Sequence, residues 1–354
     1  MITIKDIGTY ETIPPIVNDI IIGNIPSLDE YFKQDWNIEN KISLSKYIEQ
    51  TPLDFALMME SFDSVKWLVE KGVNLNVKHN PSFLSAVRYC NEDIIRYLVA
   101  NGAKINVLNN VKSEAFQQAL YGKRYENLPL IHELGHSVEK YGGEAFRQAV
   151  NDKNYDVLEF FISNNVDINY NKPDMVYSFN STPLCVAARY VNLDMCKYLV
   201  KHGADVTLTE KDGMRPYSIA VEKGDKEMAD FFKSIEPADF HSLNNKLDEL
   251  KPYKLPKSLI DYLQGDKLHI DLPESDFKFI EFFSLMETIP FKVGKQKLLR
   301  ISKITGDYTD IIVVWNPKSK KIAYHDSEHK ELFDLCTFEE FLKCPEEQLE
   351  KYFH

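Results

Sequence analysis

The sequence predicts an all-α repeat solenoid followed by a smaller α+β domain with an antiparallel sheet. Two observations lead to this prediction. A pattern of two short helices recurs with a period near 33 residues over the first two thirds of the 354-residue chain. Beyond residue 236 the period stops, and short apolar runs separated by turn residues follow. We therefore expect a repeat domain over residues 1–236 and a second domain over residues 240–354.

The clearest repeat lies between Asn180 and Asp212. Its Thr182-Pro183 pair predicts a helix start, because proline fixes φ and lacks the N–H that a first helical residue leaves unpaired. The following residues give a short first helix an apolar face. A second helix ends at Gly203, where a left-handed residue can close it. One such helix pair cannot bury its own apolar face, so we expect neighbouring copies to stack on it.

An alanine in the first helix marks six copies in phase. These alanines lie 30, 33, 30, 38 and 33 residues apart, at Ala56, Ala86, Ala119, Ala149, Ala187 and Ala220. In the fourth copy Asn165 takes the place of the closing glycine, since asparagine tolerates the left-handed conformation. Residues 14–35 fit a degenerate N-terminal cap, with Asp35 at the glycine position.

The Thr-Pro-Leu start, the alanine and the closing glycine resemble the ankyrin repeat over residues 14–236. The resemblance implies stacked pairs of antiparallel helices with a concave groove that binds another protein. It also implies that the residues just after the first-helix alanines face this groove. On this sequence, the groove positions expected to bind a partner are Met58, Met59, Arg88, Tyr89, Tyr121, Asn151, Asp152, Arg189 and Tyr190.

The pair Arg-Tyr occurs twice at these positions, which is the composition of binding hot spots. The alternative is that the tyrosines stack between repeats and the arginines only solvate the face. The 38-residue spacing before the fifth copy adds a projecting finger with apolar residues where a solvent-facing loop would be polar. They either fold back on their own repeat or anchor a partner. The finger residues in question are Tyr170, Met175, Tyr177 and Phe179.

The last third of the chain predicts mixed helices and strands. A helix is expected over residues 255–263, with a proline at its start. Strands are expected over residues 298–304, 311–315 and 321–324, whereas residues 277–286 fit either a strand or a helix. Thr337-Phe-Glu-Glu is a capping box for a further helix, and a last helix is expected over residues 345–353. These elements indicate one central antiparallel sheet flanked by helices.

The order of these pieces resembles the SUKH (Smi–Knr) superfamily over residues 240–354. The resemblance rests on Leu255-Pro256, Ser284-Leu-Met-Glu287, Thr305-Gly-Asp307, Tyr324-His-Asp-Ser-Glu328 and the capping box at Thr337. It implies a non-enzymatic binding domain. Many bacterial members are immunity proteins that neutralise toxins, often nucleases. On this basis we expect a bacterial immunity protein that blocks a toxin by occlusion.

Composition narrows the classes of partner. The net charge of −12 argues against nucleic acid and would speed encounter with a basic protein. No apolar run is long enough to cross a membrane, and the N-terminus lacks the pattern of an export signal. The five cysteines have no CxxC spacing and are expected to fill the core in a reducing, cytoplasmic compartment. Oligomeric state is left open.

No motif predicts a catalytic, cofactor-binding or metal-binding residue. His325 and His329 have the H-x-x-x-H spacing, but they are expected in a turn after a strand, where this spacing does not align two zinc ligands. Two alternative functions stay open at this point. One is a scaffold or effector that engages a host protein. The other is a hydrolase that uses His325, Asp326 and Glu328.

Overall fold

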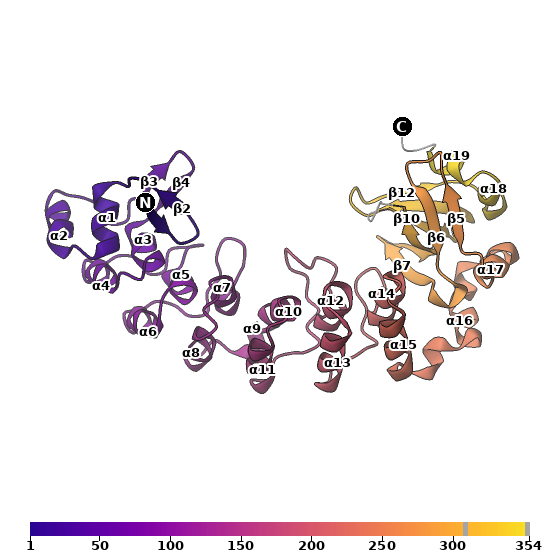
Figure 1. Ribbon diagram of the computed structural model, residues 1–354, viewed down its shortest axis with the longest axis horizontal. Coiled ribbons are helices and arrows are strands. Elements are labelled where there is room, and N and C mark those ends of the chain that lie inside the picture. The colour runs from indigo at the N-terminus through magenta and orange to yellow at the C-terminus, as the bar shows by residue number, and fades with distance from the viewer. Residues whose placement is uncertain (307–310, 351–354) are drawn as a thin grey trace. The chain divides into compact units, whose positions relative to one another are not determined.

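The computed structural model describes residues 1–306 and 311–350 (Figure 1). The chain divides into two compact units, Met1–Asp167 and Ile168–His354. This division differs from the sequence-based boundary at residues 236–240, since the last repeat helices belong to the second unit. The two-domain assignment therefore stays a prediction.

The first unit contains a cap and four of the predicted helix pairs. The cap helices are α1 (Pro15–Ile22) and α2 (Ile25–Lys33). A short helix, α9 (Val138–Tyr141), precedes the last pair. The pairs are α3 (Pro52–Met58) with α4 (Phe62–Glu70), α5 (Ser82–Tyr89) with α6 (Glu92–Ala100), α7 (Ala115–Tyr121) with α8 (Asn127–Glu133), and α10 (Gly143–Asn151) with α11 (Tyr155–Ser163).

Local signals position these helices as the sequence predicts. Thr51 begins α3 with a capping box, in which its side chain accepts from the Asp54 N–H and the Asp54 side chain accepts from the Thr51 N–H. Asp35 and Asn165 adopt left-handed φ values of 61° and 60° at the glycine positions. The first-helix alanine at residue 86 is fully buried, as a tightly stacked helix requires.

The first unit is not purely helical, so the all-α prediction is wrong for its N-terminal part. Strands β1 (Ile2–Ile4) and β2 (Gly8–Tyr10) form one antiparallel hairpin, and β3 (Ile42–Ser45) and β4 (Ile48–Gln50) form another. Isoleucine, threonine and tyrosine favour extended backbone here. Ile4 is completely buried and anchors the first hairpin to the unit.

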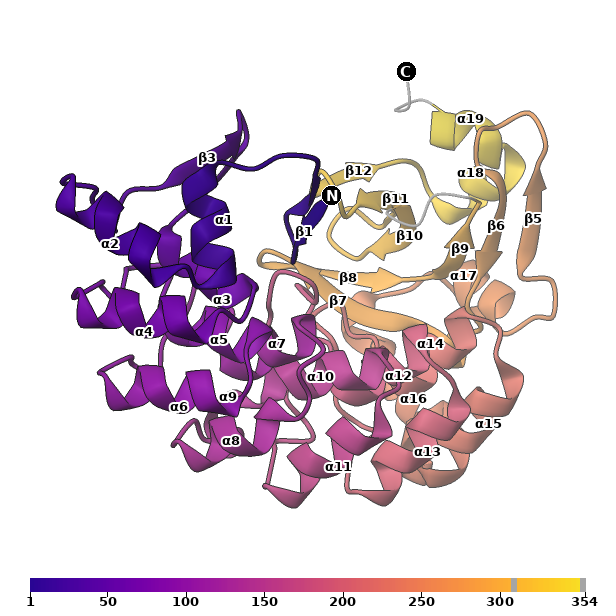
Figure 2. The same ribbon diagram turned by 60° about the vertical axis from the view of Figure 1, so that its left-hand side comes forward.

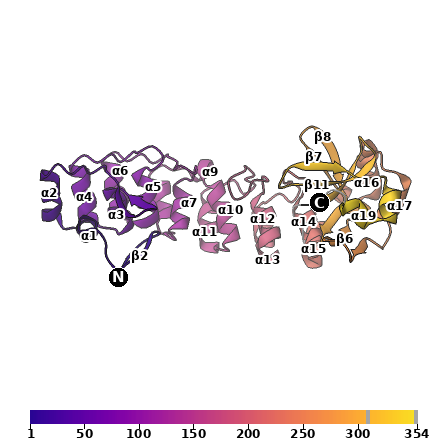
Figure 3. The same cartoon turned by 90° about the horizontal axis from the view of Figure 1, so that it is seen from above.

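The second unit begins with the last two predicted helix pairs, which lie side by side (Figure 3). They are α12 (Pro183–Tyr190) with α13 (Leu193–Lys201), and α14 (Pro216–Glu222) with α15 (Lys226–Ile235). The Thr182 side chain caps α12 by accepting from the Cys185 N–H at 3.1 Å. The helical linkers that follow are η1 (Ala238–His241), α16 (Leu243–Leu250), η2 (Lys251–Tyr253) and α17 (Lys257–Leu263).

Two antiparallel sheets follow, where the sequence predicted one central sheet. The three-stranded sheet has the order β5-β6-β9, and the five-stranded sheet has the order β12-β11-β10-β8-β7. The bounds are β5 (His269–Leu272), β6 (Lys278–Phe282), β7 (Ile289–Val293), β8 (Gln296–Arg300), β9 (Ser302–Thr305), β10 (Ile311–Asn316), β11 (Lys321–Asp326) and β12 (Glu331–Asp334).

The difference arises at one bend in the chain. The segment 298–304, predicted as a single strand, divides into β8 in one sheet and β9 in the other. At the bend, the buried Ser302 Oγ accepts the Val313 N–H at 2.8 Å, which satisfies that donor where the strand pairing changes. The ambiguous segment 277–286 is resolved as β6 followed by the short helix η3 (Leu285–Glu287).

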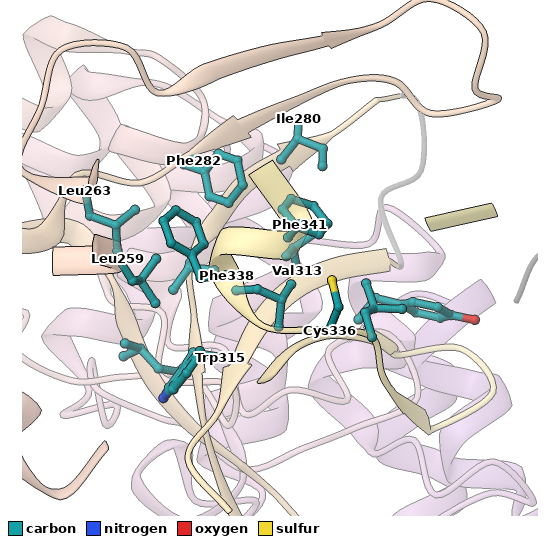
Figure 4. Packing of buried hydrophobic residues seen from close by; sticks show 14 of the residues in the cluster. Leu259, Leu263, Ile280, Phe282, Val313, Trp315, Cys336, Phe338 and Phe341 are labelled. Atoms are coloured by element: carbon teal, nitrogen blue, oxygen red, sulfur yellow. The ribbon is translucent and has the colours of Figure 1, made fainter. Parts of the chain in front are cut away.

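The five-stranded sheet has buried residues on both faces. One face packs with α17 and α18 (Phe338–Lys343) around a core that includes Leu259, Val313, Trp315 and Phe341 (Figure 4). The Trp315 Nε1–H donates to the Tyr253 carbonyl at 2.8 Å. Opposite this core, a small cluster contains Phe291, Leu298, Val314 and Ala323. The predicted capping box at Thr337 is confirmed, with both reciprocal bonds to Glu340 present.

The predicted last helix is described as α19 (Pro345–Glu350). Its expected end at residue 353, and Asp307 of the predicted turn after β9, lie outside the described residues. Four of the five cysteines are buried, as expected of core residues, and Cys344 is half-buried. In the described part of the chain, no helix combines the length and the apolar character that a membrane span requires.

Candidate functional site

The predicted groove positions of the first unit differ widely in exposure. Tyr89 and Met58 are buried, with 8% of each residue exposed, whereas Tyr121 is 44% exposed. Met59 and Arg88 are half-buried, and Asn151 and Asp152 are exposed. Met58 and Tyr89 therefore offer a partner little surface. The binding role of these positions stays a prediction.

The N-terminal hairpin explains the burial of Tyr89. Its turn places Asp6 between two groove residues, where the Asp6 carboxylate accepts from Arg88 Nε and from the Tyr89 hydroxyl, both at 2.8 Å. Lys5 Nζ donates to Glu60 at 3.0 Å and to the Tyr89 carbonyl at 3.2 Å. This part of the face is thus already occupied by the chain's own first residues.

In the second unit, Arg189 and Tyr190 end helix α12 and have different environments. Tyr190 is 59% exposed. The Arg189 guanidinium bridges two carboxylates, with Nη2 at 2.6 Å from Glu210 and Nη1 at 3.2 Å from Glu222. Glu222 also accepts from Arg300 of β8 at 2.6 Å. This ion-pair chain links two repeats to the five-stranded sheet.

Burial shapes the electrostatics of this chain of ion pairs. The Glu210 side chain is only 3% exposed. Its burial raises the pKa of the Glu210 carboxyl, and the nearby positive charge of Arg189 opposes that rise. Ser181 Oγ also donates a hydrogen bond to Glu210. Glu210 therefore accepts from two donors, Arg189 and Ser181. Loss of either donor would leave the Glu210 carboxylate poorly solvated.

The finger contributes one exposed wall. Met175 is 81% exposed and Phe179 is 45% exposed, whereas Tyr170 and Tyr177 are half-buried. The Asp174 carboxylate accepts the Val176 N–H at 2.7 Å and so fixes the local turn. Two of the four predicted finger residues are thus exposed and two are half-buried, and their role in binding a partner stays a prediction.

These elements line an open cavity of about 630 Å³ within the second unit. The finger, helices α12 and α14, and strands β7, β8, β10 and β11 all contribute to its walls. Strands β7 and β8 lie next to α14 (Figure 2). Its apolar lining comes from Val176, Tyr177, Phe179, Tyr190, Phe291, Val293 and Ile312.

Charged groups surround this apolar lining. Lys211, Lys292 and Lys330 are exposed at the cavity, whereas Arg189 and Arg300 are held by the carboxylates described above. Asp212, Glu210 and Glu222 are the acidic lining residues. An apolar cavity with charged groups at its border is typical of sites that bind a ligand or a partner side chain.

Sequence reasoning found only part of this lining. It identified Arg189, Tyr190, Tyr177 and Phe179, but it missed the contribution of the sheet. The run Pro290-Phe-Lys-Val-Gly294 alternates between apolar and polar residues and could have indicated a strand with one exposed face. Nothing in the sequence indicates that this strand lies next to a repeat helix far earlier in the chain.

The histidine cluster does not converge on one point. His325 belongs to β11 rather than to the following turn, and its Nδ1 lies 2.8 Å from the Glu331 carbonyl. His329 Nδ1 instead lies 2.8 Å from the Asp326 carboxylate. Within the described residues, His325 is the member of the trio His325, Asp326 and Glu328 that lines the cavity.

Comparison with known proteins agrees with the repeats. The family model described as "Ankyrin repeats (3 copies)" matches residues 17–109 and 146–242. An ankyrin repeat protein of fowlpox virus (strain NVSL) is 26% identical over 174 residues, which is 48% of this chain and 91% of that protein.

Two further relatives come from very different organisms. An ankyrin repeat protein of Rickettsia bellii (strain RML369-C) is 26% identical over 37% of this chain and 84% of its own length. An ankyrin repeat protein of Acanthamoeba polyphaga mimivirus is 25% identical over 65% of this chain, but the match spans 30% of that protein. Together with the helix pairs in both units, the family match shows that this chain belongs to the ankyrin-repeat proteins.

Proposed function

We propose that this chain is a protein-binding module and that its partner docks at the cavity of the second unit. Ankyrin repeats are protein-interaction modules, and the cavity is lined by the last two of them. The observation that carries the proposal is the exposed aromatic pair at its border, Tyr190 at 59% and Phe179 at 45%. Exposed aromatic side chains beside an apolar cavity are the residue type that supplies most binding energy in interfaces.

The second unit is favoured over the first because of what occupies each face. In the first unit, Arg88 and Tyr89 are engaged by Asp6 of the N-terminal hairpin. A partner would have to displace that hairpin before it could contact more than a small part of Tyr89. In the second unit Tyr190 needs no such rearrangement, and Arg189 holds the wall of the cavity through Glu210 and Glu222.

Peptide selection on the full-length chain tests the site. Twelve-residue peptides would be selected from a random displayed library and their affinities measured on the unmodified protein. The double variant Phe179→Ala/Tyr190→Ala should weaken them about tenfold or more, because each truncation removes an interface anchor. The matched control Tyr47→Ala/Leu108→Ala truncates two exposed apolar residues of the first unit and should change affinity less than twofold. Unchanged affinity in a folded double variant would reject the cavity as the site.

A finer proposal concerns the identity of the partner. We propose that it is a toxin, that the chain neutralises it in the cytoplasm by occlusion, and that the chain catalyses no reaction. Support comes from the SUKH-like order of motifs in residues 240–354. The helix α17 after Leu255-Pro256, the strands β10 and β11, and the capped helix α18 occur in that order.

Co-expression tests the finer proposal separately. Each growth-arresting protein encoded beside this gene would be expressed with the unmodified chain or with Phe179→Ala/Tyr190→Ala. We expect the unmodified chain to restore growth and the double variant to fail. Failure of the unmodified chain against every such protein would reject toxin neutralisation. It would leave the peptide-binding result intact.

A further inference from the structure

A strip of lysines lies on the second unit beside the cavity. Lys292, Lys295 and Lys297 belong to the β7–β8 hairpin, and Lys254 and Lys318 lie near it around a shallow pocket of about 630 Å³. The described residues that line this second pocket include no carboxylate. Val293 lines both this pocket and the cavity, so the two sites are neighbours. We refer to these five residues as the lysine strip.

The strip is unusual for this chain. The whole protein has a net charge of −12, yet all five residues of the strip are exposed, and among the described ion pairs none involves them. Lys292 and Lys297 are cross-strand partners in the register of β7 and β8. Like charges directly opposite one another weaken a sheet, so folding alone gives no reason for this pair. An external anion would offset the repulsion.

The chemistry of the neighbouring cavity indicates what kind of anion fits. Its lining is apolar and it also contains Glu210, Asp212 and Glu222. Glu210 and Glu222 are paired with arginines and three lysines are exposed at the cavity, so its charges accept either a nucleic acid or an acidic polypeptide, and other features decide between them. The strip contains lysines only, without the arginines and interleaved aromatic residues that are typical of nucleic-acid grooves. A polypeptide can instead place carboxylates on the lysines and an apolar side chain in the cavity.

We propose that the lysine strip docks an acidic segment of the partner protein, with a neighbouring apolar side chain of that segment in the cavity. This inference rests on the proposed function and specifies the chemistry of the partner. It differs from the expectation drawn from net charge, which favoured a basic partner. Net charge acts on the approach of two proteins, whereas the strip acts at contact distance, where the local charges decide the fit.

Peptides selected on the full-length chain provide the test. We expect them to be enriched in aspartate and glutamate around one aromatic or aliphatic residue, and to bind more weakly as salt is raised. The variant Lys292→Glu/Lys295→Glu/Lys297→Glu should weaken them about tenfold or more. The control Lys41→Glu/Lys78→Glu/Lys104→Glu makes the same change in net charge at exposed lysines of the first unit and should have less than a twofold effect. Circular dichroism checks that both variants fold, and Lys→Gln substitutions at the same three positions give a milder version.

Three results would overturn the inference. Selection of neutral or basic peptides that bind at Phe179 and Tyr190 would leave the proposed function in place and would reject an acidic segment as the ligand of the strip. Acidic peptides that are insensitive to the charge reversals would place their carboxylates elsewhere. If a twelve-nucleotide poly-dT probe binds as tightly as the acidic peptides and loses its affinity in the same lysine variant, that result would assign the strip to nucleic acid. A different result would count against the proposed function itself. In that result, peptide affinity falls in the lysine variant but is unchanged in Phe179→Ala/Tyr190→Ala.

Discussion

An Arg-Tyr dipeptide occupies equivalent repeat positions in the two units, but its tyrosine is buried in the first unit and exposed in the second. At the end of α5, Tyr89 is 8% exposed and bonded to Asp6, whereas at the end of α12, Tyr190 is 59% exposed. Arg88 pairs with the hairpin, whereas Arg189 pairs with Glu210 in the loop before α14 and with Glu222 at the end of α14. Repeat position alone therefore does not make a residue part of a free binding surface. What packs over that position decides its role.

Truncation of the two tyrosines should give the largest difference in stability loss between the two units. Tyr89→Ala removes a buried aromatic side chain and its hydrogen bond, so we expect the free energy of unfolding to fall by about 3 to 5 kcal/mol. Tyr190→Ala should change it by about 0.5 kcal/mol or less, because the side chain is mostly in solvent. Urea denaturation followed by circular dichroism gives both values. Equal losses of unfolding free energy would mean that the two tyrosines contribute equally to stability, which would contradict the difference in burial.

For the two arginines we expect the opposite: truncation in the second unit should destabilise the protein more than truncation in the first. Arg189→Ala leaves the buried Glu210 without its charged partner, which we expect to cost about 2 kcal/mol after allowance for the partial exposure of Arg189. Arg88→Ala leaves Asp6, whose side chain is 45% exposed, and should cost about 1 kcal/mol or less. Denaturation of both variants in parallel measures the difference. A larger loss for Arg88→Ala would contradict it.

Removal of Asp6 tests whether the hairpin holds the first face closed. Asp6→Ala deletes the acceptor of Arg88 and Tyr89, and we expect a loss of about 1 kcal/mol. Hydrogen exchange should become faster in residues 2–10, since fewer contacts hold the hairpin down. Glu11→Ala, an exposed acidic residue just after β2, is the matched control and should leave exchange unchanged. Unaltered protection in Asp6→Ala would show that Ile4 and the hydrogen bonds of Lys5 hold the hairpin without Asp6.

The smallest expected effect is a pH dependence that belongs to the second unit. Burial raises the pKa of Glu210 above its ordinary value of 4.5. The folded state therefore binds this proton more tightly than the unfolded state, and the contribution to stability is present below pH 4.5 and is lost as pH rises through the folded pKa. The unfolding free energy of the unmodified chain minus that of Glu210→Gln should fall over this range. A flat or rising difference would contradict the assigned direction.

The repeats were predictable because their determinants are local. Helix starts at Thr51 and Thr182, and the left-handed ends at Asp35 and Asn165, depend on residues a few positions apart. The strands β10 and β11 and the cap at Thr337 were predictable for the same reason. The N-terminal hairpin was missed because two three-residue strands carry too short a pattern to distinguish them from a loop.

The candidate site was predictable only in part. Tyr190 and Phe179 were identified from repeat position and from apolar residues in an inserted loop. The walls contributed by Phe291, Val293 and Arg300 were not, because their approach to α14 depends on how the sheet packs on the last repeat. That packing brings Pro290 so close to Gly213 that a Cβ added at Gly213 would lie 2.6 Å from the Pro290 carbonyl oxygen.

The sequence by itself determined the helix pairs, their period, the finger and the place where the repeat ends, since each follows from spacing, capping and turn residues close together in the chain. Only the tertiary structure decided which Arg-Tyr pair is covered and which borders a cavity, and only it brought the lysines together in one strip. The physical reason is that burial and charge proximity depend on contacts between segments far apart in sequence, and no local pattern records those contacts.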